Sequence, residues 1–109
     1  MISIYRFLGL AAASFLLCLN ALAAEPQHFT FRHQGMEREY ILYVPDGIGC
    51  NAPLVMVLHG YGGRAMHSGA GMCRTADREK FAVCFPQGAK DGKGKTCWNV
   101  GYPFQKGLK

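Results

Sequence analysis

Two segments near the start of the chain have the composition of β-strands. Residues 29–32 alternate apolar and polar side chains, which is the period of a strand. Residues 39–44 follow after a turn signal at Gln34 and Gly35, and Pro45 closes them. The pattern predicts an antiparallel β-hairpin that ends at Val44.

After this hairpin, five apolar residues follow without interruption from Leu54 to Leu58. A run of this length that contains two valines is typical of a strand buried on both faces of a parallel sheet. A glycine-rich turn, His59 to Gly63, follows it at once. Glycines permit positive φ angles and close approach of the backbone to a ligand. In α/β folds ligands bind at this carboxyl end of the strands, so the turn is the first candidate site.

The segment after the turn changes to a helical period. Met72, Cys73 and Ala76 fall on one face of a predicted helix over 71–80, and a second apolar strand is predicted over 81–85. Two parallel strands need a crossover of this kind, so residues 54–85 predict one βαβ unit behind the hairpin. The expected fold class is α/β. Residues 87–95 predict a loop rich in glycine and lysine, and 98–100 the start of another element.

The first residues have the form of a secretory signal peptide. Arg6 is followed by an apolar region from Phe7 to Leu19, and Ala21 to Ala23 form a small-residue cleavage signal. We therefore expect a signal peptide over 1–23, one domain over 24–109 and a secreted or periplasmic protein. The apolar run is short for a membrane span, and Cys18 lacks the small residues that lipidation needs before it, so no stable membrane anchor is expected after cleavage.

Composition narrows the classes of partner. The formal net charge is +5, and the basic surplus lies mostly in a glycine-rich region near the end of the chain, at Lys90, Lys93, Lys95, Lys106 and Lys109. No aromatic or helical scaffold interleaves with these lysines, so the pattern predicts a solvated basic loop and no nucleic-acid partner.

Four cysteines remain after the predicted cleavage: Cys50, Cys73, Cys84 and Cys97. In an oxidising compartment four cysteines are candidates for two disulfides, with three connectivities open. Cys84 lies inside an apolar run and also fits a buried thiol. The sequence has no C-x-x-C pair, so no metal site is predicted.

Two chemistries use a glycine turn after a strand. Residues 60–65 satisfy the dinucleotide fingerprint G-x-G-x-x-A. However, the next strand ends Phe85-Pro86-Gln87 without an acidic residue for the ribose, and the predicted helix begins several residues late. The second chemistry is an oxyanion hole, in which a backbone N–H after the third strand of an α/β-hydrolase stabilises the negative charge of a tetrahedral intermediate. A His-Gly-x-Gly turn is the form such a loop takes.

The sequence resembles the N-terminal part of secreted esterases of the polyhydroxybutyrate depolymerase and feruloyl esterase type. The matching segments are residues 40–45, 53–63, 75–83, 85–88 and 97–99. The resemblance implies an antiparallel hairpin and one βαβ unit of an α/β-hydrolase fold, a carboxylic-ester substrate and no cofactor. It further implies that Tyr61 and Gly62 donate N–H groups to the oxyanion. His59 would brace the loop, with Gly60 and Gly63 as loop support.

The chain departs from this family at the nucleophile. The family's nucleophile stands in G-x-S-x-G, whereas the single serine after residue 23 is Ser68, with Met66 and Ala70 at the flanking positions. In the family the nucleophile, the acid and the histidine of the triad all lie downstream, so we expect no catalytic triad residue here. The chain is expected to be an incomplete hydrolase domain that ends before the nucleophile and is inactive alone.

The same resemblance implies that the strand over 54–58 is an edge strand beside the strand over 81–85. An uncharged apolar edge is a template for self-association. Two other functions stay open at this stage. One is a small exported binding or interaction module on the same scaffold, and the other is the dinucleotide-binding βαβ unit.

Overall fold

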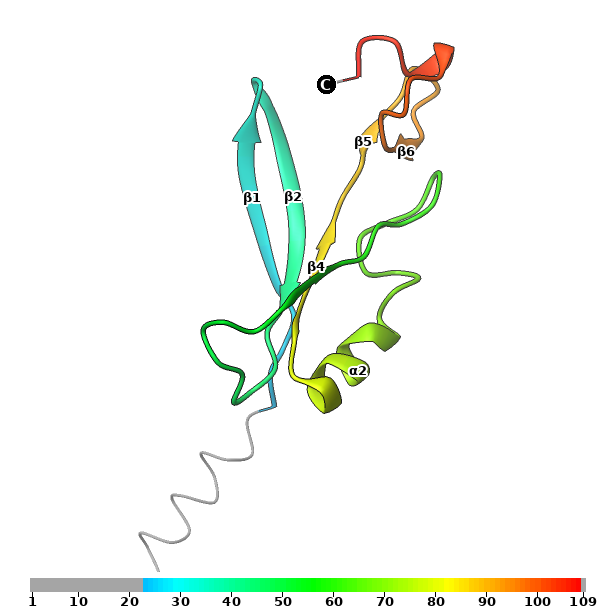
Figure 1. Ribbon diagram of the computed structural model, residues 1–109. Coiled ribbons are helices and arrows are strands. Elements are labelled where there is room, and N and C mark those ends of the chain that lie inside the picture. Colours follow the sequence, from blue (N-terminus) through cyan, green and yellow to red (C-terminus); the bar gives the residue numbers. More distant parts are fainter. Residues whose placement is uncertain (1–22, 109) are drawn as a thin grey trace, which may run out of the picture.

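The computed structural model describes residues 23–108. Apart from Ala23, the predicted signal peptide lies outside the described residues. Within them the chain forms a four-stranded mixed sheet, a separate two-stranded sheet, one α-helix and a short 3-10 helix (Figure 1). The broad expectation of strands combined with a helix therefore holds, although strands outnumber helices.

The predicted hairpin is confirmed and is longer than expected. β1 (Gln27–His33) pairs antiparallel with β2 (Met36–Tyr43). The two residues between them, Gln34 and Gly35, both have positive φ, which suits a tight two-residue turn. On one face the rings of Phe29 and Tyr40 stack across the strands with centroids 5.3 Å apart.

The predicted strand–helix–strand connection is also present. β3 (Leu54–Met56) runs parallel to β4 (Ala82–Pro86), and α2 (Gly71–Glu79) lies in the crossover between them. β4 also pairs antiparallel with β2, so the strand order is β1-β2-β4-β3. β3 is thus an edge strand beside β4, as expected. It is shorter than predicted, although Val57 N–H still donates to the carbonyl of Cys84 at 2.9 Å.

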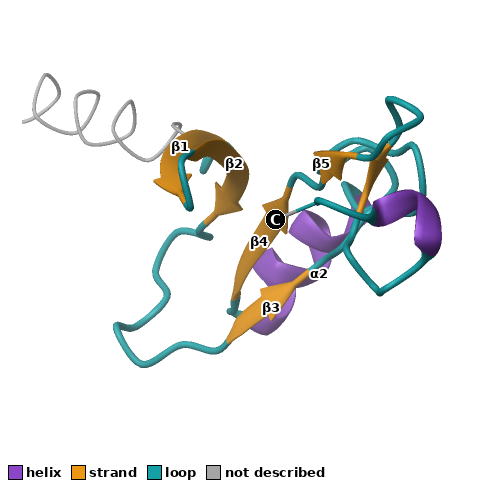
Figure 2. Cartoon of the chain, turned by 90° about the horizontal axis from the view of Figure 1, so that it is seen from above, coloured by secondary structure: helices purple, strands orange, loops and turns teal. Residues whose placement is uncertain are grey.

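The core lies between α2 and one face of the sheet (Figure 2). Val83 and Phe85 of β4 are fully buried there, together with Ala76 of α2. Met72 and Cys73 pack against this cluster, which confirms the predicted apolar face of the helix. Tyr43 is also buried in the cluster, and its hydroxyl donates to Asp77 Oδ1 at 2.5 Å.

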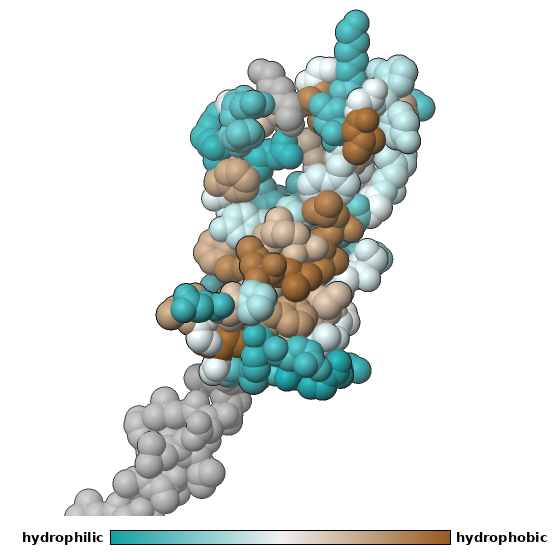
Figure 3. Space-filling model, viewed as in Figure 1, coloured by the Kyte–Doolittle hydropathy of each residue, from teal (hydrophilic) through white to brown (hydrophobic). Residues whose placement is uncertain are grey.

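The opposite face of the sheet is not covered by any helix among residues 23–108. Leu54, Met56 and Leu58 alternate with the core-facing residues of β3, and each is more than half exposed. The expectation that this strand is buried on both faces is therefore wrong, because α2 packs on one side only. In Figure 3, which has the same view as Figure 1, hydrophobic residues gather on the side of the molecule where β3 lies in front of β4.

The glycine- and lysine-rich segment is more ordered than predicted. β5 (Ala89–Lys90) and β6 (Thr96–Cys97) form a small antiparallel hairpin, and a 3-10 helix, η1 (Pro103–Gln105), follows. Asp91 Oδ1 accepts the N–H groups of Lys93 and Lys95, which closes the turn between the strands. An aspartate that bonds to the backbone two residues later is a turn former, and this explains the ordered segment.

The four cysteines among residues 23–108, which the sequence offers as candidates for two disulfides, are free thiols in the structure. Cys50 is exposed in the loop before β3, and Cys73 lies on α2. Cys84 and Cys97 are buried in β4 and β6, which belong to different sheets. The alternative interpretation of Cys84 as a buried small side chain agrees with its position.

The described residues contain no helix that is long and apolar enough to cross a membrane.

Candidate functional site

The glycine turn lies at the carboxyl end of β3. It is tight, since Gly63 N–H donates to the carbonyl of Gly60 at 3.0 Å and Gly62 has a φ of 76°. A Cβ added at Gly63 would lie 2.9 Å from Gly60 O and 3.0 Å from His59 Cβ. Only glycine fits there without moving the backbone. Gly60 has open space around its missing Cβ, so its glycine is less strictly required.

His59 is buried and holds this turn in place through hydrogen bonds of its ring. The N–H of Gly88 donates to His59 Nε2 at 2.9 Å, so Nε2 must carry a lone pair. The proton therefore stands on Nδ1, which donates to the carbonyl of Gly60 at 2.7 Å. His59 is held as a neutral imidazole with both nitrogens in use. This arrangement makes it a structural brace, with no free nitrogen for proton transfer.

Gln87, which directly follows β4, and Trp98, which directly follows β6, add further hydrogen bonds to the turn. Gln87 Oε1 accepts the N–H of Ala65 at 2.7 Å, and its Nε2 lies 3.0 Å from His59 Nε2. The indole N–H of Trp98 donates to the carbonyl of His59 at 2.8 Å. The turn is therefore tied to the residues that directly follow β4 and β6, and it has little freedom to open.

The two predicted backbone donors, the N–H groups of Gly62 and Tyr61, differ in whether they are already hydrogen-bonded in this structure. Gly62 N–H donates to the carbonyl of Thr96 at 2.7 Å, and the Thr96 hydroxyl donates to the carbonyl of Gly63 at 2.6 Å. Among residues 23–108 the N–H of Tyr61 has no hydrogen-bond acceptor. Tyr61 is thus the predicted donor that is available in this conformation, whereas the N–H of Gly62 is committed to β6.

The side chain of Tyr61 is fixed by Asp91. The Tyr61 hydroxyl donates to Asp91 Oδ2 at 2.8 Å, although the side chain as a whole is 56% exposed. This hydrogen bond, with burial and the negative charge of Asp91, raises the pKa of Tyr61. Burial raises the pKa of Asp91, but hydrogen bonds from Lys95 N–H, the Tyr61 hydroxyl and Lys93 N–H outweigh it and lower that pKa overall. Asp91 therefore remains ionised and anchors Tyr61.

A concave surface of about 280 Å³ adjoins the turn, and we call it the aromatic groove. Tyr102 and Phe104 stack with centroids 5.4 Å apart, and Tyr61 meets Phe104 edge-on at 5.9 Å. The ring of Trp98 lies 5.0 Å from that of His59. The residues that line the groove are His59, Gly60, Tyr61, Cys97, Trp98, Val100, Tyr102, Phe104 and Gln105.

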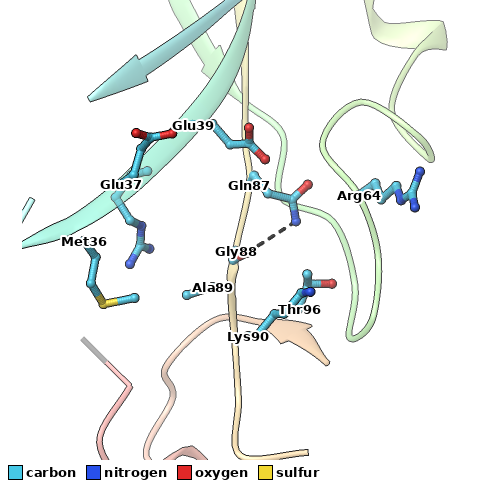
Figure 4. Close-up of a pocket in the computed structure, with 10 residues that line it drawn as sticks. Met36, Glu37, Glu39, Arg64, Gln87, Gly88, Ala89, Lys90 and Thr96 are labelled. Atoms are coloured by element: carbon cyan, nitrogen blue, oxygen red, sulfur yellow. Dashed lines mark hydrogen bonds between the residues drawn. The ribbon is translucent and has the colours of Figure 1, made fainter. Parts of the chain in front are cut away.

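A second concave surface lies on the other side of Gln87 and is lined by both charged and apolar groups. It has a volume of about 580 Å³ and lies where β2 and β5 diverge. Figure 4 shows Glu37 and Glu39 on the β2 side, Arg64 on the opposite side and Gln87 between them. The Glu39 carboxylate is already within 3.1 Å of His28 Nε2. This cleft does not include Tyr61 or the aromatic rings.

Sequence reasoning missed four residues that hold the site together. Gln87 and Trp98 were recognised as part of matching segments but had no role assigned, Asp91 was placed in a loop, and Thr96 was not considered. Gln87, Trp98 and Thr96 act through contacts with residues far away in the sequence, so no local pattern marks them. The Asp91-Gly92 pair was the one usable signal, because this dipeptide is a common turn former.

The alternative of a dinucleotide site finds little support in the geometry. Residues 61–70 form turns, and α2 begins only at Gly71, so no helix N-terminus directly follows the glycines. A pyrophosphate site of this kind needs that helix N-terminus. The described residues also contain no group of three or more His, Cys, Asp or Glu side chains that could hold a metal ion.

In comparisons with known proteins, no protein-family model matches the chain, and no curated protein matches it.

Proposed function

We propose that this chain carries the oxyanion-binding half of a serine carboxylesterase site of the polyhydroxybutyrate depolymerase and feruloyl esterase type. The observation that carries the proposal is the uncommitted N–H of Tyr61 in a rigid glycine turn at the carboxyl end of β3. A donor that is fixed before the substrate arrives needs no reorganisation when negative charge develops, and this is the main contribution of an oxyanion hole.

The bracing of the turn supports this role. An N–H stabilises a transition state only if it is held in place, and here the flanking residues His59 and Gly63 are each hydrogen-bonded to other elements. The neutral His59 cannot act as a general base, because both of its ring nitrogens are occupied. We therefore propose His59 as a positioning residue for the turn.

The attacking half of the reaction is not proposed for this chain. Ester hydrolysis by this route needs a serine hydroxyl whose proton is taken by a histidine. The serine oxygen attacks the carbonyl carbon, the alcohol leaves with that proton, and water then hydrolyses the acyl-enzyme to release the acid. Ser68 lies in the turns before α2 and is not in a G-x-S-x-G elbow. We propose that the 109-residue chain by itself does not turn over esters.

An esterase assay tests the proposed inactivity, and NMR of single amides tests the donor assignment. The purified chain is assayed on p-nitrophenyl acetate and butyrate, and we expect no hydrolysis above the background rate. Hydrolysis that a serine-directed phosphonate abolishes would refute the proposed inactivity.

The donor assignment is tested at single amides by NMR. We expect the Tyr61 amide to exchange quickly with solvent and to shift when methylphosphonate, a tetrahedral anion, is added. The Gly62 amide is the internal control, because its bond to Thr96 should protect it. A protected Tyr61 amide that does not respond to the anion would contradict the assignment.

A small exported binding module on the same scaffold is the second candidate function. The aromatic groove favours it, because such a surface can bind a ligand without any nucleophile. A ligand that binds the groove while the Tyr61 amide stays unperturbed would favour this function over the esterase proposal.

A further inference from the structure

The outer edge of β3 is open along the segment from Leu54 to Leu58, which we call the edge segment. The carbonyl of Pro53 and the N–H of Val57 bond to β4, each at 2.9 Å. Neighbouring residues of a strand turn their backbone groups to opposite sides, so those of Leu54, Met56 and Leu58 point away from β4. In the described part of the chain these outward groups have no hydrogen-bond partner. The edge segment therefore presents a free row of backbone donors and acceptors.

Nothing on the edge segment blocks pairing with a further strand. Native sheets protect open edges with charged side chains, prolines or bulges, whereas the edge segment holds only apolar residues. Leu54, Met56 and Leu58 are 57%, 55% and 57% exposed and lie on the uncovered face of the sheet. The opposite end of the sheet is protected, because β1 carries His28 and Arg32. Figure 2 shows β3 at the margin of the sheet, where another strand can approach it.

The sequence of the edge segment reads the same in both directions, Leu-Val-Met-Val-Leu. A two-fold axis at Met56 therefore places Leu54 of one copy opposite Leu58 of the other. The same axis places Val55 opposite Val57. Paired residues of antiparallel strands point to the same face, so leucine meets leucine and methionine meets methionine. This self-match identifies a second copy of the chain as the strand that fits the edge.

We propose that two copies of the chain pair antiparallel through their edge segments, with the two-fold axis at Met56, so that their four-stranded sheets join into one. In this register Leu54, Met56 and Leu58 form the hydrogen-bonded pairs, and each pair exchanges two bonds. Each copy uses its one unprotected edge, so the contact closes at two copies. The contact is small, and we expect a weak dimer with a dissociation constant on the order of 0.1 mM. The proposal goes beyond the ester chemistry and does not involve the Tyr61 N–H.

Disulfide cross-linking measures the register directly. Cys18 and Cys50 are first replaced by serine, because Cys50 is exposed and Cys18 lies outside the described residues. Met56→Cys then places a thiol at the axis, where the Cα atoms of directly paired residues are about 5.5 Å apart. This separation is within the disulfide range of about 4.4 to 6.8 Å, so we expect a covalent dimer when an oxidant is added.

Leu54→Cys and Leu58→Cys in the same background are the matched controls. Each of these positions lies about 14 Å from its own counterpart along the paired strands. Neither variant alone should therefore form a covalent dimer. An equimolar mixture of the two should form one, because the register places Leu54 of one copy directly opposite Leu58 of the other.

Sedimentation velocity tests the hydrogen bonds of the contact. The purified chain should change from mostly monomer at about 10 μM to mostly dimer at about 1 mM, and to nothing larger. Met56→Pro removes the N–H that points outward and spares the bonds of Pro53 and Val57 to β4, so the variant should stay monomeric. Met56→Val keeps the N–H and should still dimerise. Circular dichroism of each variant confirms that it is folded.

Three results would overturn the proposal. A chain that sediments as a monomer up to about 1 mM does not pair through its edge segment. If Met56→Cys gives no more covalent dimer than its serine background, or Leu54→Cys alone gives as much, the register is wrong. If folded Met56→Pro still dimerises, or the chain grows beyond a dimer, the closed contact at β3 is wrong. None of these results bears on the Tyr61 amide, so this proposal and the proposed function can fail separately.

Discussion

Substitution of Tyr43 by phenylalanine tests how the core holds the sheet to the helix. Tyr43 is buried at the end of β2, and its hydroxyl donates to Asp77 on α2 at 2.5 Å. The substitution removes this one hydrogen bond and keeps the ring. Because Asp77 is exposed, its carboxylate regains water when the partner is lost, and no buried charge is left unpaired.

The size of the effect follows from the pKa of the Tyr43 hydroxyl. The hydrogen bond to Asp77, together with burial, raises the pKa of Tyr43 from 10.0 to about 12. A difference of about 2 in pKa corresponds to about 2.7 kcal/mol. Water competes for the exposed Asp77, so we expect a loss of about 1 to 2 kcal/mol in the free energy of unfolding. In a small domain this is a large share of the total stability.

The same bond predicts a pH dependence with a definite sign. The folded chain holds the Tyr43 proton more tightly than the unfolded chain, so the contribution is fully present below pH 10.0 and is lost as the pH rises towards 12. The difference in stability between the chain and the Tyr43→Phe variant should therefore be constant near neutral pH. It should shrink between these two pH values.

Urea unfolding followed by circular dichroism at about pH 8 and about pH 11.5 measures this difference. Lysines also lose charge in this range, but they do so in both chains, and their effect cancels in the comparison. Tyr40→Phe is the control, since the Tyr40 hydroxyl makes no hydrogen bond among residues 23–108. A Tyr43→Phe difference that is the same at both pH values would refute the reasoning.

Two further predictions concern the site and the sheet edge. Gly88→Ala should lower the free energy of unfolding by about 1 to 3 kcal/mol, because the added Cβ would lie 2.5 Å from the carbonyl oxygen of Cys97. Gly60→Ala places its Cβ in open space and should lower it less. Urea unfolding midpoints that do not separate the two variants would contradict this. Met56→Lys places a charge on the uncovered face of the edge strand β3 and should reduce self-association. Sedimentation velocity measures this. A Met56→Lys variant that sediments like the unsubstituted chain would argue against self-association through β3.

The local elements were predictable because they depend on nearby residues. Apolar and polar alternation marked the β1–β2 hairpin, and the spacing of Met72, Cys73 and Ala76 marked α2. The glycine turn was also visible in the sequence, since a run of glycines after an apolar strand has few structural explanations. The burial of β3 was predicted wrongly, because an apolar run does not reveal whether a second layer covers its other face.

The fine structure of the site was not predictable in the same way. Asp91 was read as a loop residue, yet it anchors Tyr61 and closes the β5–β6 turn. The aromatic groove joins Tyr61, Trp98 and Phe104, which come from separate segments of the chain. Nothing in the spacing of these aromatics indicates that they meet.

The sequence alone determined that the chain has a hairpin, a strand–helix–strand unit and a glycine turn after an apolar strand, because each follows from side-chain periodicity and backbone freedom within a few residues. Only the tertiary structure decided which N–H of that turn is free. Gly62 is paired because β6 brings the carbonyl of Thr96 to it, and Tyr61 is left unpaired because no acceptor of the described chain reaches it. Hydrogen bonding depends on what folding places within about 3 Å, which residue order by itself does not specify.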